Sequence, residues 1–145
     1  MAGVLRSLKN SLREQVSRHR NRPFFEAAMA AAALVVQADG KVTLSERYRL
    51  DQIIEQLDQL KIFDVHEAAD LMNDNLDAIR HHPREAHPRL MKAVARIADD
   101  SKAAHLLVRI CLAISIADDE YHPDEKARIG EICDALGLDP AEFET

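Results

Sequence analysis

The sequence predicts an all-α fold built as one domain over residues 1–145. Apolar residues recur at helical spacing along most of the chain, and no strand-like alternation bounded by turns stands out. Hydrophobic residues make up 47% of the sequence and charged residues 30%, with only four glycines and five prolines, which is typical of a compact globular protein. A chain of this length buries about 68–70% of its unfolded surface, enough for a core without disulfides or metals.

The first of about seven predicted helices covers residues 3–20, and residues 1–22 form a basic N-terminal amphipathic segment. Its apolar stripe is Val4, Leu8, Leu12 and Val16, and its flanking bases are Arg6, Lys9, Arg13, Arg18 and Arg20. Asn21, Arg22 and Pro23 are expected to interrupt it, because the residue before a proline disfavours helix. Two interpretations stay open: the stripe packs into the core, or the helix lies on anionic lipid.

The second helix is expected from Phe24 to Ala38, where an uninterrupted apolar run predicts the centre of the fold. The third begins at Thr43 and continues to about Leu57. The fourth is capped by Asp64, which forms a capping-box pattern with the residue three positions on, and it ends near residue 80.

The fifth helix, residues 84–98, is expected to hold Pro88 in its first turn, the position where a helix tolerates proline. Ser101 is the expected N-cap of the sixth helix, residues 101–117. The seventh opens at His122, with Pro123 as its first helical residue. Gly137 ends it as a left-handed residue.

An internal repeat relates the two halves at a shift of 79 residues. Residues 24–60 and 101–137 then form two helix–loop–helix units with loops of equal length. The matched pairs are Ala38 with Ala117, Asp39 with Asp118, Glu46 with Glu125, Arg49 with Arg128, Leu50 with Ile129, Ile53 with Ile132 and Leu57 with Leu136. The repeat predicts pseudo-twofold symmetry around two central apolar helices.

Charge is distributed unevenly, with six Lys or Arg against one Glu in residues 1–22 and an overall net charge of −6. The acidic remainder disfavours nucleic acid as a partner. The longest apolar run, Ala27–Val36, has ten residues, whereas a membrane span needs about 20. With no secretory signal at the N-terminus, we expect a cytoplasmic protein. Cys111 and Cys133 have no second cysteine nearby, so both are expected as buried free thiols.

Each repeat places an Asp at the end of one helix and a Glu seven residues later, as Asp39 with Glu46 and Asp118 with Glu125. Carboxylates beside loop carbonyls suit a hard cation such as Ca²⁺ or Mg²⁺. Gly40 allows the first loop to turn sharply, and the second loop adds three acids: Asp119, Glu120 and Asp124. The spacing is shorter than that of an EF-hand loop.

The same glutamates have a second explanation in helix capping. Thr43 and Glu46 form a capping box, and His122 with Glu125 nearly repeats it. Capping does not explain an Asp at a helix C-terminus, where the macrodipole disfavours negative charge, and this occurs in both repeats. The sequence therefore leaves cation binding and capping open together.

Catalytic motifs are not found in the sequence, so we do not expect an enzyme. His81, His82, Glu85 and His87 form the nearest approach to a transition-metal pattern, and a solvated helix junction explains them better.

The chain resembles the tellurite-resistance TerB family over nearly its whole length. In the first half the matching segments are Arg22-Pro23-Phe24-Phe25, Ala38-Asp39-Gly40-Lys41-Val42 with Glu46, and Lys61-Ile62-Phe63-Asp64. In the second half they are Ile116-Ala117-Asp118-Asp119, Asp124-Glu125-Lys126, Glu131-Ile132-Cys133 and Leu136-Gly137-Leu138-Asp139-Pro140-Ala141-Glu142-Phe143. The family usually has Gly where this chain has Asp119.

This resemblance implies an all-helical bacterial cytoplasmic protein of tellurite resistance and chemical stress, acting at the inner face of the membrane with an integral-membrane protein of the same system. It also implies metal binding by Asp39, Glu46, Asp118 and Glu125, with Asp119 as a further ligand. Three hypotheses follow: a divalent-metal-binding stress module, a metal-independent adaptor whose acids bind basic partner surfaces, and an enzyme that reduces tellurite through Cys111 and Cys133. We favour the first.

Overall fold

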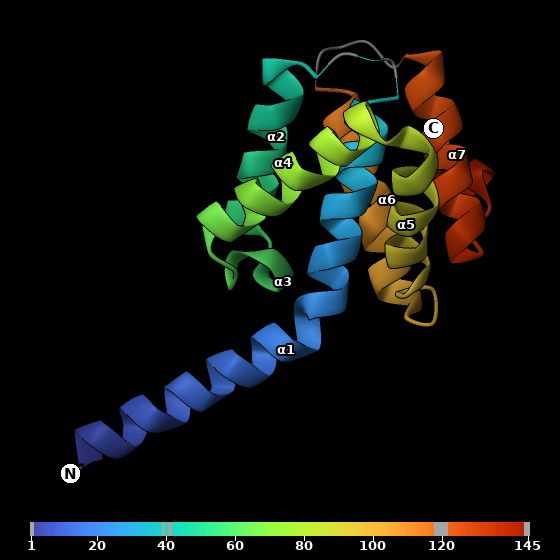
Figure 1. Ribbon diagram of the computed structural model, residues 1–145. Helices are drawn as coiled ribbons and strands as arrows, with labels where there is room; N and C mark the ends of the chain where they lie inside the picture. The colour runs from blue at the N-terminus through green and yellow to red at the C-terminus, as the bar shows by residue number, and fades with distance from the viewer. Residues whose placement is uncertain (1, 39, 41, 118–121, 144–145) are drawn as a thin grey trace.

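The computed structural model describes residues 2–38, 40, 42–117 and 122–143, and within these ranges the protein is helical and has no strand (Figure 1). Seven α-helices and one 3-10 helix follow in order: α1 Ala2–Val36, α2 Leu44–Gln56, α3 Asp58–Lys61, α4 Val65–His81, α5 Pro83–Ala95, α6 Ser101–Ser115, α7 Pro123–Leu136 and η1 Pro140–Phe143. The predicted all-α fold class is confirmed.

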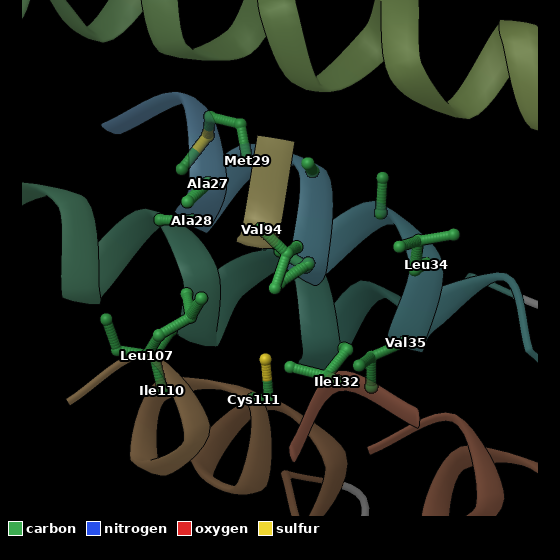
Figure 2. Close-up of a cluster of buried hydrophobic side chains, with 14 of the residues drawn as sticks. Ala27, Ala28, Met29, Leu34, Val35, Val94, Leu107, Ile110, Cys111 and Ile132 are labelled. Atoms are coloured by element: carbon green, nitrogen blue, oxygen red, sulfur yellow. The ribbon is translucent and has the colours of Figure 1, made fainter. Parts of the chain in front are cut away.

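The second half of α1 is the centre of the core, as the sequence predicted. Helices α3, α4, α5, α6 and α7 all contact α1. Side chains of α1 such as Ala28 and Val35 lie in one buried cluster with Val94 of α5, Leu107 of α6 and Ile132 of α7 (Figure 2). A helix enclosed on most sides needs apolar residues around its whole circumference, which explains the uninterrupted apolar run.

The buried stretch of α1 begins at Phe24. From Ala27 to Val36 every residue is at most 2% exposed. Phe25 stacks on Phe63, which follows α3, with ring centroids 4.2 Å apart. The core therefore starts where the basic N-terminal segment ends.

The predicted interruption at residues 21–23 is wrong, because α1 runs through Pro23 without a break. A proline inside a helix removes one backbone hydrogen bond and bends the helix, but propagation on either side can continue. Asn21 Nδ2 donates to the carbonyl oxygen of Ser17 at 2.9 Å, which supplies a polar contact in the turn before the proline. The N-terminal part of α1 leaves the body at an angle to the buried part (Figure 1).

The start of α5 and the segment after α2 also differ from the prediction. Helix α5 begins at Pro83, so Pro88 is its sixth residue and lies beyond the first turn. Pro88 is exposed, and its ring costs the helix only one bond, to a carbonyl near the helix start. The third predicted helix ends at Leu57 as expected, because this residue has an extended backbone, but the short helix α3 that follows was not predicted.

The predicted caps are confirmed at some helices and wrong at others. Asp64 caps α4 by accepting from the backbone N–H of His66 at 2.7 Å, but Glu67 contacts Arg22 and does not complete a capping box. The N-cap of α6 is Asp100, one residue before the predicted serine. Its carboxylate accepts from the N–H three residues on at 3.1 Å. Aspartate is as good a cap as serine, so the sequence does not distinguish them.

The caps of α7 agree with the sequence. His122 is the N-cap, Pro123 is the first helical residue, and Gly137 ends the helix with a φ of 72°. Cys111 and Cys133 are buried and free, as expected. Helices α1 and α6 contact each other in the core, and the pseudo-twofold relation between the two halves stays a prediction.

Candidate functional site

The helix ends that flank the two predicted acidic segments lie at one end of the molecule. The C-terminal ends of α1 and α6 and the N-terminal ends of α2 and α7 lie together at this end (Figure 1). Of the five predicted metal-binding residues, Glu46 and Glu125 are described by the structure. Asp39, Asp118 and Asp119 lie outside the described residues.

The first loop turns at Gly40, as its sequence predicted. Gly40 has a φ of 79°, a conformation that residues with a Cβ rarely adopt. Its N–H donates to the carbonyl oxygen of Gln37 at 3.0 Å, which closes a tight turn directly after α1. The chain is thereby redirected from α1 toward the start of α2.

Glu46 lies in the first turn of α2 and is only 1% exposed. Its backbone N–H donates to Thr43 Oγ1 at 3.1 Å, and its Oε1 accepts from the backbone N–H and the hydroxyl of Thr43 at 3.2 and 3.0 Å. The predicted capping box is confirmed. A carboxylate near a helix N-terminus is favoured by the macrodipole, so the box holds a buried acid where its charge is best tolerated.

Glu125 has the same position in α7, as the third helical residue, and is 4% exposed. The cap there differs from the first, because His122 Nδ1 accepts from the backbone N–H of Asp124 at 3.2 Å. The imidazole therefore acts as a cap, as the sequence indicated. Both halves place a buried glutamate in the first turn of the helix that follows an acidic loop.

The histidine cluster does not form a metal centre. His81, His82 and Glu85 are exposed, which agrees with the solvated junction expected there. Among the described residues, no group of three or more His, Cys, Asp or Glu side chains is placed to hold a metal ion.

His87 instead connects α5 to α7. Its Nδ1 lies 2.8 Å from Arg128 Nη1, and its Nε2 lies 3.1 Å from Glu131 Oε2. An arginine can only donate, so Nδ1 accepts in this contact. Sequence spacing could not find this contact, because the partners are 41 residues or more apart.

Arg22 connects two of the segments that resemble the TerB family. It contacts Glu67 and Glu26, and its guanidinium carbon lies 5.6 Å from the ring centroid of Phe25 and 5.9 Å from that of Phe63. The hydrogen bond to Glu67 raises the pKa of Arg22. These contacts join α1 to Phe63 in the connection between α3 and α4 and to Glu67 in α4, so Arg22 helps to hold these elements together.

The two thiols are poorly suited to redox chemistry. Burial raises the pKa of Cys111 to about 12, and burial also raises the pKa of Cys133. The thiolate is the reactive form of cysteine, and inert buried cysteines are those whose pKa is raised. The geometry thus gives no support to the hypothesis that these cysteines reduce tellurite.

The fold and the paired helix starts define a small all-helical protein. The family described as tellurite resistance protein TerB matches residues 25–145, and the chain belongs to this family. A tellurium resistance protein TerB from Alcaligenes sp is 25% identical over 108 residues, which cover 74% of this chain and 88% of that relative. No solved structure matches the chain.

The family gives the protein a role related to tellurite resistance. It is associated with resistance and not with catalysis, which is consistent with the expectation that the chain is not an enzyme. No helix among the described residues is long and apolar enough to span a membrane.

Proposed function

We propose that this tellurite-resistance protein binds a divalent cation at the end of the molecule where α2 and α7 begin. The observation that carries the proposal is the burial of Glu46 and Glu125 at matching positions at that end. In the sequence, Asp39 and Asp118 precede these glutamates by seven residues. Carboxylate oxygens are the ligands that hard cations such as Ca²⁺ and Mg²⁺ prefer.

The cation would set how the protein meets its partner, an integral-membrane protein of the same resistance system. Binding of a cation neutralises part of the acidic charge of this end and fixes the two loops relative to each other. A partner surface that recognises the fixed arrangement would then bind the loaded protein better. The family match supports the relation to tellurite resistance. The membrane-bound partner is part of the proposal and follows from the resemblance to the family.

The test is a calorimetric titration of chelator-treated protein with Ca²⁺, Mg²⁺, Mn²⁺ and Zn²⁺. We expect a dissociation constant of about 10⁻⁶ M or lower for at least one cation, and its loss in Asp39→Asn and Asp118→Asn, which keep shape and remove charge. Asp134→Asn is the matched control, because Asp134 is an exposed residue near the opposite end of α7. Substituting Asp119 by Gly tests whether this residue adds a ligand.

A metal-independent adaptor is the second candidate, and the Thr43 box favours it. That box explains the position of Glu46 without any cation. In this case the acidic loops bind basic residues of the partner, and chelator leaves the complex intact. A folded protein that binds none of the four cations would replace the first proposal by this one.

A further inference from the structure

The N-terminal part of α1, residues 3–20, forms an exposed arm with an unpartnered apolar face. Its five apolar side chains are Val4, Leu5, Leu8, Leu12 and Val16, and each is between 57% and 67% exposed. Single exposed apolar residues are ordinary, but a contiguous group on one element marks an interaction site. The interpretation in which this stripe packs into the protein's own core is wrong for the described structure. The family match starts at residue 25, so the arm lies outside it.

The arm carries its apolar and basic residues in two adjacent bands. At about 100° per residue, the five apolar positions fall within a sector of about 120°. Lys9, Arg20, Arg13 and Arg6 occupy the adjoining sector of about 60°, and Arg18 falls near the other border of the apolar sector. Ser7, Asn10, Ser11, Glu14 and Ser17 cover much of the remaining circumference. The arm is therefore an amphipathic helix with most of its cations along one border of its apolar face.

A cavity of about 960 Å³ continues this surface where the arm meets the body. Leu12 and Val16 of the arm line it together with Phe24, Ile97 and Leu106. Cations surround this apolar lining: Lys9, Arg13, Arg20, Arg96 and Lys102. Two acids, Asp99 and Asp100, also line it, and Asp100 is engaged as the cap of α6. Val4, Leu5 and Leu8 lie beyond the cavity, so an occupant of the whole face must be extended.

We propose that this arm docks on an anionic lipid surface. The apolar side chains would enter the boundary between headgroups and acyl chains, and the basic band would lie against lipid phosphates. Charge complementarity favours this occupant, because residues 1–22 hold six Lys or Arg and a single Glu. Antiparallel pairing of two arms through their apolar faces would bring the two basic bands to the same side, where like charges at close range repel. The proposal is independent of the cation site and of its test.

The experiment is cosedimentation of the full chain with vesicles of phosphatidylcholine alone or with about 30% phosphatidylglycerol. We expect about tenfold stronger binding to the anionic vesicles, and a marked fall when salt is raised from about 0.05 to about 0.5 M. Equal binding to both vesicles, or none to the anionic ones, would overturn the proposal.

Matched variants separate the apolar face from the rest of the arm. Leu8→Gln with Leu12→Gln removes two apolar side chains and should weaken anionic-vesicle binding by about tenfold or more. Ser7→Gln with Asn10→Gln changes the other side of the helix and should leave it within about twofold. Lys9→Gln with Arg13→Gln should reduce both the binding and its salt dependence. Circular dichroism checks that each variant is folded.

Sedimentation of the protein without vesicles measures its oligomeric state and so tests whether a second copy of the chain covers the apolar face. If the chain dimerises and Leu8→Gln with Leu12→Gln dissociates the dimer, while anionic vesicles bind neither form, the face is an interface between copies and the lipid proposal fails. A monomer whose vesicle binding is unchanged by the same two substitutions also contradicts it.

Discussion

Single residues fix the starts of the helices at the end of the molecule that carries the acidic loops. Thr43 and Glu46 satisfy each other's polar groups within one helical turn, and the glutamate is almost completely buried. A buried carboxylate is costly unless it is hydrogen-bonded, so the threonine does more than cap a helix. It also keeps the acid in a defined position at the candidate site.

Replacing Thr43 by Ala should lower the free energy of unfolding by about 1 kcal/mol, the usual effect of losing an N-cap. Urea denaturation measures the change. Ser45→Ala is the control, because Ser45 is exposed in the same turn and forms none of the cap hydrogen bonds. Equal midpoints for the two variants would show that the box contributes nothing to stability.

The buried thiols predict a pH dependence at alkaline pH. The pKa of Cys111 in the folded protein is about 12, against an ordinary value of 9.0. Below pH 9.0 the thiol is protonated in both states; above it the unfolded chain releases the proton first, so stability falls as pH rises from 9.0 toward about 12. Replacing Cys111 and Cys133 by Ala should make this fall shallower, as measured by urea midpoints at several pH values.

At the scale of elements, local sequence signals predicted that the helices exist better than they predicted the residues at which each helix begins and ends. The caps at Thr43, Asp64 and His122 were predictable because a cap and its partners lie within a few residues. Continuation through Pro23 was not, because it depends on the helix segments on both sides of the proline, one of them held by the core.

At the candidate site, too, sequence spacing predicted the local features and not the long-range contacts. Sequence spacing placed Glu46 and Glu125 at helix starts, and the capping box was visible in it. The burial of these side chains depends on how helices pack, which spacing does not report. The contacts of His87 with α7 and of Arg22 with Glu67 join distant residues and were not predictable from one sequence.

The alanine-rich part of α1 allows a prediction about packing in the core. Ala31 is fully buried, and close-packed interiors have no room for three further carbon atoms. Ala31→Leu should therefore destabilise the protein by about 1–3 kcal/mol through overpacking. Ala127→Leu, at an exposed position of α7, should be close to neutral. Thermal or urea unfolding of both variants tests the difference.

At the scale of the whole molecule, one helix passes through two environments. The arm is solvated, whereas the segment from Phe24 to Val36 is enclosed by the other helices. The family match begins at residue 25, close to the point where burial begins. The buried part of α1 therefore lies in the body and not in the arm.

Hydrogen exchange should separate the two halves of α1. We expect backbone amides of residues 6–18 to exchange at least about 100-fold faster than those of residues 26–36 in the free protein, because only the latter require the core to open. Mass spectrometry of peptides from each half measures the ratio. Similar protection in both halves would mean that the arm is covered in solution.

The continuity of α1 also limits the distance between the arm and the opposite end of the molecule. The buried segment of α1 runs from Phe24 to Val36, and a helix of that length spans about 20 Å. If the arm lies on a bilayer as proposed, the starts of α2 and α7 stand away from it by no more than the length of this segment, about 20 Å. In that arrangement, any partner that reached the starts of α2 and α7 from the bilayer would have to extend to about the same height above the lipid.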